Sequence, residues 1–188
     1  MLERTIGRRS GPDQTLCRTA RHQHGQSLVE FALILPVLML VLMGIVQMGF
    51  VFNAYVTISN ATREAARTAT IYLYDRNESA GTNDTARNEA ARGALGAGMG
   101  MLSAASPWFA NSSTWTITNA GDTFTTGDLV IAYTLPAGIT DTDSRVGQRV
   151  SVSMTYHLDL LIPFIGAILP HDANGRLPLT AQVSMLVN

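Results

Sequence analysis

An uninterrupted apolar run near the N-terminus limits the folds open to this chain more than any other feature of its sequence. Between Glu30 and Arg63 there is no charged side chain. Within that stretch, Phe31 to Phe52 form a run of 22 residues whose only strongly polar member is Gln47. As an α-helix the run would span about 33 Å, close to the thickness of the hydrocarbon core of a bilayer. A core helix of a soluble protein would show a polar stripe, so the run predicts a transmembrane helix.

The segment before the apolar run predicts the orientation of that helix. Residues 1–25 are polar and carry five arginines and two acidic residues, for a net charge of +3. Basic residues beside a membrane span favour the cytoplasmic side, so we expect the N-terminus inside and the C-terminal part outside. An ordinary secretory signal that is removed entirely is the alternative. The run is long for such a signal, and no clear small-x-small cleavage site follows it.

The helical pattern continues beyond the apolar run. From Asn53 to Leu73 the sequence contains no Pro or Gly. The sequence therefore predicts one helix from Leu28 to Tyr74, with its first half in lipid and its second half amphipathic. Pro36 lies inside this helix, removes one backbone hydrogen bond and predicts a kink. The residues of the amphipathic face recur at spacings of three and four, and they are Tyr55, Ile58, Thr62, Ala65, Ala69 and Tyr72.

The C-terminal part predicts a small outer domain. Asp75–Asn83 contains turn-forming residues and is expected to be a linker. Asp84–Leu102 then predicts a second helix with Asp84 as its N-cap, and Ala86, Ala90, Ala94 and Ala97 give this helix a small-residue face. Leu160–Leu169 is apolar for a loop, so it either fills the core or forms a contact surface. Four segments show strand patterns: Thr114–Thr118, Leu129–Thr134, Arg149–Leu158 and Leu179–Val187.

The junction between the basic leader and the apolar run carries a short motif. It reads His24-Gly25-Gln26-Ser27-Leu28-Val29-Glu30-Phe31, in which a glycine ends the leader and a glutamate follows five residues later. This motif resembles the type IV prepilin signal, which a membrane-embedded prepilin peptidase cuts after the glycine. The resemblance implies cleavage between Gly25 and Gln26, with Glu30 and Phe31 as the remaining motif residues. It also implies that Glu30 pairs with the new N-terminal amine of a subunit, which in this chain belongs to Gln26.

A second element narrows the resemblance. GQSLVEFALILP begins at Gly25, and Asn60–Arg67 reads NATREAAR. Together they resemble the TadE family of tight-adherence pilus assembly over residues 25–67. The resemblance implies a minor pilin or pseudopilin in the cytoplasmic membrane that contacts other pilins and the membrane platform proteins of a pilus and secretion machine. Arg63, Glu64 and Arg67 would then be a docking stripe, although a solvated helix face with a weak Glu64–Arg67 pair explains them equally well.

These expectations combine into one fold class and three parts. The fold class is α+β, with a long pilin-like N-terminal helix, a second helix and a small antiparallel β-sheet. The parts are a cytoplasmic leader (1–25), a TadE-like transmembrane and extended helix (26–74) and an extracytoplasmic α+β domain (75–188). The net charge of −1 for the whole chain gives no support for nucleic-acid binding.

No catalytic motif is present, so we expect neither an enzyme nor a cofactor or metal. The sequence lacks a P-loop, a nucleophile elbow and an H-E-x-x-H motif. His157 with Asp159, and His171 with Asp172, are more typical of surface polarity than of metal binding. Two other hypotheses remain open. One is an uncleaved signal-anchored protein whose exposed domain binds a ligand or a surface. The other is a general-secretion pseudopilin or competence pilin. Pro36 and the Arg63–Arg67 element favour the tight-adherence branch over this second alternative.

Overall fold

The computed structural model describes residues 23–102, 114–138, 144–160 and 169–188. The chain divides into two compact units, Met1–Met43 and Gly44–Asn188. Helix α1 (Gln23–Thr70) contributes to both units and contains Pro36. Among the described residues it is the one helix that is long and apolar enough to cross a membrane. Except for the half-buried Leu35, the large apolar side chains from Leu28 to Met43 are exposed, as lipid-facing side chains would be.

The second half of α1 is amphipathic, as the sequence predicted. Ile58, Thr62, Ala65 and Ala69 are buried, which confirms the central part of the predicted face. The prediction was wrong at Tyr55, which is 50% exposed. The predicted bounds were shifted as well, because α1 begins at Gln23 instead of Leu28 and ends at Thr70 instead of Tyr74. The polar side of the helix is exposed, and it comprises Asn53, Asn60, Arg63, Glu64 and Arg67.

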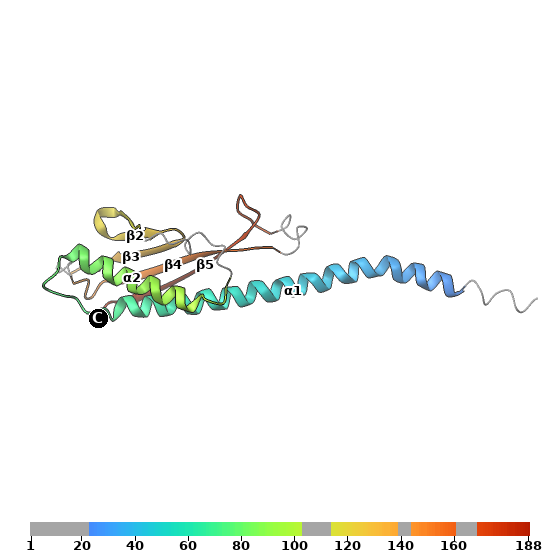
Figure 1. Cartoon of the computed structure of the whole chain (residues 1–188), viewed down its shortest axis with the longest axis horizontal. Helices are drawn as coiled ribbons and strands as arrows, with labels where there is room; N and C mark the ends of the chain where they lie inside the picture. Colours follow the sequence, from blue (N-terminus) through green and yellow to red (C-terminus); the bar gives the residue numbers. More distant parts are fainter. Residues whose placement is uncertain (1–22, 103–113, 139–143, 161–168) are drawn as a thin grey trace, which may run out of the picture. The chain divides into compact units, whose positions relative to one another are not determined.

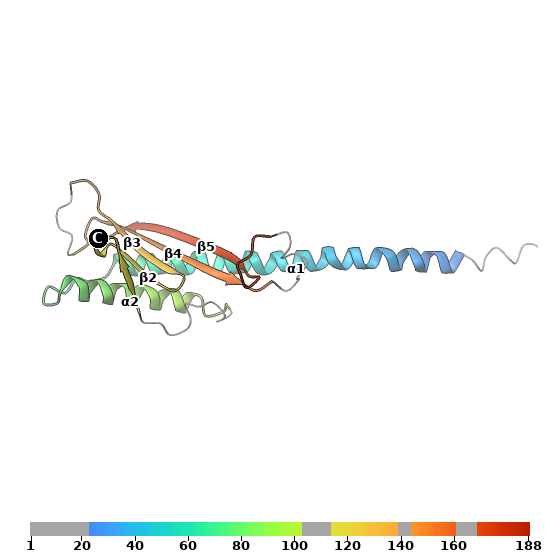
Figure 2. The same cartoon turned by 90° about the horizontal axis from the view of Figure 1, so that it is seen from above.

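Five antiparallel strands form a meander in chain order (Figure 2). The strands are β1 (Thr116–Thr118), β2 (Thr123–Thr126), β3 (Leu129–Thr134), β4 (Arg149–Leu158) and β5 (Leu177–Leu186). The bounds of β3 and β4 are those that the sequence predicted, whereas β1 is shorter and β5 begins two residues earlier. Strand β2 was not predicted, because TFTT is short and mostly polar. Most of the apolar segment Leu160–Leu169 lies outside the described residues, so its predicted role stays a prediction.

The second helix, α2, runs from Ala80 to Gly98 instead of the predicted Asp84–Leu102, so it begins inside the predicted linker. Two further predictions for this helix were wrong. Its N-cap is Ser79, whose hydroxyl accepts a hydrogen bond from the Thr82 N–H at 3.1 Å, so Asp84 is not the cap. The predicted small-residue face also points outwards, since Ala86, Ala90 and Ala97 are exposed. The residues that α2 buries are Asn83, Asp84, Arg87, Asn88, Ala91 and Leu95.

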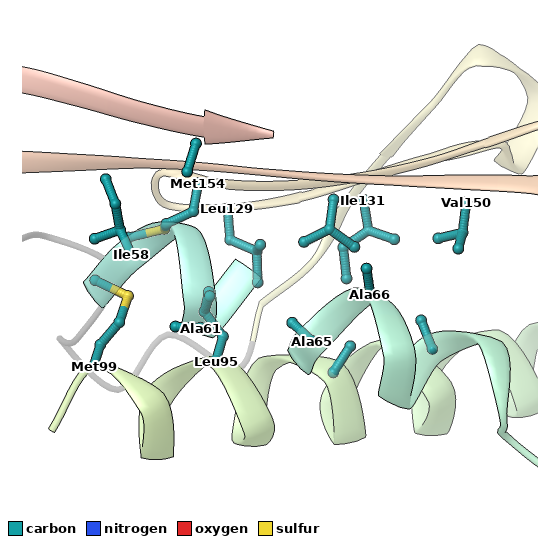
Figure 3. Close-up of a cluster of buried hydrophobic side chains, with 14 of the residues drawn as sticks. Ile58, Ala61, Ala65, Ala66, Leu95, Met99, Leu129, Ile131, Val150 and Met154 are labelled. Carbon is teal, nitrogen blue, oxygen red and sulfur yellow. The ribbon is translucent and has the colours of Figure 1, made fainter. Parts of the chain in front are cut away.

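Both helices pack on the same face of the sheet. The end of α1 nearest Thr70 and the whole of α2 lie side by side beneath the strands (Figure 1). In the core, Ala66 faces Ile131 and Val150 of the sheet, while Ala61 lies beside Leu95 of α2 (Figure 3). Small alanine side chains therefore allow α1 to approach its neighbours closely, and this close approach positions the polar groups described below.

The backbone of α2 at Gly98 lies directly against Ala61 of α1. A Cβ atom added at Gly98 would lie 2.8 Å from the Cβ of Ala61 and 3.0 Å from its Cα. Backbone and a methyl group cannot move aside as a flexible side chain can, so the helices would have to separate. Gly93, in the same helix, has no atom within 4 Å of an added Cβ.

We expect Gly98→Ala to lower the free energy of unfolding by about 1–3 kcal/mol, because overpacking forces the backbone to shift. Gly93→Ala is the matched control, and it should raise stability by up to about 1 kcal/mol through helix propensity. Thermal unfolding of the detergent-purified chain, followed by near-UV circular dichroism, measures both effects. Equal stability of the two variants would contradict the close packing of α1 and α2.

Candidate functional site

The prepilin-type motif lies in the first turns of α1. The helix begins at Gln23, so the bond between Gly25 and Gln26 lies inside its first turn. Gly25, Gln26, Glu30 and Phe31 are all exposed. Gln26 and Glu30 are four residues apart, which places them on the same helix face in successive turns. The Glu30 carboxylate therefore stands about one turn from the backbone nitrogen that cleavage would convert into an amine.

Pro36 does not end α1. The helix is continuous from Gln23 to Thr70 with Pro36 inside it. Proline cannot donate the backbone hydrogen bond that would reach the carbonyl four residues earlier. The residues on both sides of Pro36 are apolar, with Val37 exposed and Leu35 half-buried. In lipid, neighbouring helices are among the groups that satisfy such a carbonyl. The kink itself stays a prediction.

The Asn60–Arg67 element has two faces with different roles. Ala61, Ala65 and Ala66 are buried against α2 and the sheet, so the alanines of this element serve packing. The charged residues point away from the domain. Arg67 donates to Glu64 through Nη2 at 2.7 Å and through Nε at 3.0 Å.

Glu64 and Arg67 form an ordered but exposed pair. The hydrogen bond from Arg67 lowers the pKa of the Glu64 carboxyl, and the same bond raises the pKa of Arg67. Exposed pairs of this spacing add only about 0.2–0.5 kcal/mol to helix stability. Arg63 lies on the same exposed side. These three side chains are therefore accessible to a partner and contribute little to the fold.

A buried ion network joins α2 to two loops of the sheet. Arg145 is 6% exposed and donates from Nη2 to Asp84 Oδ2 at 2.8 Å and from Nη1 to Asp122 Oδ1 at 2.6 Å. Its Nη2 also donates to the carbonyl of Gly121 at 2.8 Å. Burial alone would lower the pKa of the Arg145 guanidinium, but the bonds to the two carboxylates outweigh burial and raise it. The Arg145 guanidinium therefore stays charged.

Arg87 extends this network beneath the sheet. It is 1% exposed, and its Nη2 donates to the carbonyl of Ser144 at 3.0 Å. Its guanidinium lies 5.1 Å from the ring centre of Tyr72 and 5.9 Å from that of Tyr133, within cation–π range. The Tyr133 hydroxyl donates to Asn88 Oδ1 at 2.7 Å, and burial raises its pKa. These contacts fix α2 on the sheet.

The ion network was not predicted from the sequence. Asp84 was predicted to be a helix cap, and no local pattern marks Arg145, which lies 61 residues further along the chain. One usable signal was present. Asp84, Arg87, Ala91 and Leu95 recur at helical spacing, and they mark the face that α2 buries. A charged pair on the apolar face of a helix predicts a buried partner.

The two histidines that were weighed as metal ligands with a neighbouring acid, His157 and His171, contact other groups in the structure. His157 Nδ1 lies 2.8 Å from Asp172 Oδ2, whereas Asp159 pairs with Arg176 at 2.9 Å. The pKa of Asp172 is lowered, first by the backbone N–H of Arg176 and then by Asn174 and His157. No group of three or more His, Cys, Asp or Glu side chains that could hold a metal ion occurs in the described part of the chain. The contacts of His157, Asp172 and Arg176 stabilise the turn before β5.

These features define a class of protein in which a helix of membrane-spanning length continues into an α+β domain. The family model of the TadE-like proteins matches residues 25–67, which confirms the resemblance over that segment. The match relates the chain to pilus-associated proteins with an N-terminal segment suited to a membrane anchor. It ends at Arg67, the last residue of the NATREAAR element. No curated protein and no solved structure matches the chain.

The ion network yields a stability prediction. Arg145→Met leaves Asp84 buried without its main partner, and breaking a buried pair in this way costs about 3–5 kcal/mol. Arg67→Met removes an exposed pair and should cost less than about 1 kcal/mol. Chemical unfolding of both variants in detergent, monitored by tryptophan fluorescence, checks the difference. Similar losses in the two variants would show that the network does not hold α2 on the sheet.

Proposed function

We propose that this chain is a minor pilin or pseudopilin of a tight-adherence type pilus assembly and secretion system. It is anchored in the cytoplasmic membrane by α1 and matured by a prepilin peptidase that cuts after Gly25. The observation that carries the proposal is the presence of Gly25, Glu30 and the NATREAAR element within one helix, in the segment that matches the TadE-like family. In this proposal residues 1–25 are the cytoplasmic leader and residues 75–188 form the extracytoplasmic domain.

The position of the cleaved bond explains the need for glycine. A peptidase must bind its substrate in an extended form, and the bond between Gly25 and Gln26 lies within the first turn of α1. The helix must therefore unwind locally before cleavage. Glycine weakens a helix by about 1 kcal/mol relative to alanine, and its missing side chain leaves the backbone accessible. A large residue at this position would oppose both steps.

Glu30 gains a partner through cleavage. An acid at the edge of a membrane helix is unfavourable unless a positive group is near. Cleavage places a charged amine on Gln26, and the positive end of the helix dipole repels that amine. In a bundle of processed helices, Glu30 of one subunit can form a charge-assisted contact with the amine of a neighbour. This contact gives the carboxylate a positive partner and gives the amine a negative one, so it offsets both unfavourable terms. Only processed subunits would pack in this way.

The exposed side of α1 beyond the membrane offers a second contact. Arg63, Glu64 and Arg67 form a charged stripe, while the alanines between them face the core. We assign this stripe to docking on a neighbouring pilin or on a platform protein of the machine. Its exposure, and its small contribution to stability, support a role outside the fold.

Intact-mass analysis of the membrane-extracted chain tests the processing step. In cells that contain the prepilin peptidase, the wild-type chain should begin at Gln26, whereas Gly25→Leu should begin at Met1 because the bulky side chain blocks cleavage. Gly44→Ala, in the same helix and away from the junction, is the control and should be processed normally. A wild-type N-terminus at Met1 would favour the alternative of an uncleaved signal-anchored protein with an exposed binding domain.

Replacing Glu30 tests the pairing. Glu30→Gln keeps the size of the side chain and removes its charge, so cleavage should continue while surface pili decrease. The loss of a hydrogen bond to a charged group, worth about 1.5–3 kcal/mol, corresponds to a decrease of about 10-fold or more. Glu78→Gln, in the exposed linker, is the control. Pilus counts by electron microscopy that match the wild type would remove the role assigned to Glu30.

A further inference from the structure

Processing at Gly25 changes which backbone groups of α1 are satisfied. In the intact chain α1 begins at Gln23 and has no acidic residue in its first turn. Within this helix the N–H groups of Ser27, Leu28 and Val29 reach the carbonyls four residues earlier, which belong to residues 23–25. Cleavage removes those carbonyls. The new helix end therefore holds backbone donors without acceptors, at the edge of a segment suited to lipid, where unsatisfied groups are costly.

The new end also carries a residue pattern that supplies an acceptor for one of these donors, the Ser27 N–H. Ser27-Leu28-Val29-Glu30 has a serine followed three residues later by a glutamate and then by an apolar run. In a capping box of this kind, the serine hydroxyl accepts from the backbone N–H of the glutamate, and the glutamate carboxylate accepts from the backbone N–H of the serine. Ser27 and Glu30 are both exposed and lie three residues apart, on the same side of the helix.

We propose that cleavage converts Ser27 into the N-cap of the mature helix and that Ser27 positions the Glu30 carboxylate for assembly. In the intact chain both residues are interior to α1, and the box cannot form. After cleavage one carboxylate oxygen accepts from the Ser27 N–H, and the other faces the amine at the membrane edge. Ser27 is thus a positioning residue whose effect depends on processing. The inference rests on the proposed function, because it requires cleavage after Gly25.

Glu30 has two roles in this arrangement: its side chain caps the helix end, and its charge attracts the processed amine. Glutamine also serves in a capping box, so Glu30→Gln retains the cap and loses the charge. Ser27→Ala loses the cap and retains the charge. The two variants therefore separate the stability of the helix end from the charge that meets a processed amine.

Amide hydrogen exchange of the peptidase-processed chain in detergent micelles, measured by NMR, tests the proposal. Ser27→Ala should accelerate exchange of the Ser27 and Glu30 amides by about tenfold, as loss of an N-cap does. Ser27→Thr should restore protection, because threonine also caps helices. Glu30→Gln should keep most of the protection. Ser59→Ala, elsewhere in α1, is the control and should leave these amides unchanged.

The same measurement on the Gly25→Leu chain supplies the decisive comparison. The capping box is absent from this unprocessed chain. Adding Ser27→Ala to Gly25→Leu should therefore leave the Ser27 and Glu30 amides as protected as they are in the Gly25→Leu chain alone. Acceleration of equal size in processed and unprocessed chains, or failure of Ser27→Thr to restore protection, would overturn the inference. The intact mass of the same samples distinguishes failure of the proposed processing after Gly25 from failure of the proposed Ser27 cap. A wild-type chain that begins at Met1 overturns the processing itself, whereas a processed chain that is insensitive to Ser27→Ala overturns only the cap.

Discussion

Close approach of α1 to its neighbours is the constraint on which the rest of the domain depends. A single helix is apolar on every side over a stretch suited to a membrane, and it then buries one narrow face against α2 and the sheet. Alanine meets the second demand, because Ala61, Ala65 and Ala69 leave room for backbone to approach backbone. The contact between Ala61 and Gly98 shows how little space is left. The charged residues of the same element are consequently pushed outwards, where they are available to partners.

A helix that buries alanine gains little apolar area, and the domain compensates with buried polar contacts. A methyl group contributes far less than a leucine side chain to the hydrophobic effect. Arg145 links Asp84 of α2 to Asp122 beside the sheet, and Arg87 lies under Tyr133. Buried charges of this kind contribute less to net stability than their short distances imply, since desolvation offsets attraction. Their clearer effect is geometric, because the network accepts only one placement of α2.

The sequence predicted elements with a local periodic signal and missed those that depend on distant partners. Strand β4 alternates apolar and polar residues over ten positions, and its predicted bounds agree with the structure. Strand β2 has four residues and gave no such signal. Asp84 looks like a helix cap locally, and only the pairing with Arg145 reveals its role. The family segment was recognisable because its residues are adjacent in the chain, whereas the ion network is assembled by folding.

In the proposed function, processing changes the chemistry of the N-terminal end of α1, and the residues at that end fit such a change. Removal of the leader would create a positive amine and would also leave backbone donors unsatisfied. Both consequences fall within one helical turn of Glu30, since Gln26 and Ser27 lie four and three residues before it. An uncleaved anchor would have neither consequence, and an acid there would add only cost. The position of Glu30 is thus better explained by the mature helix than by the intact one.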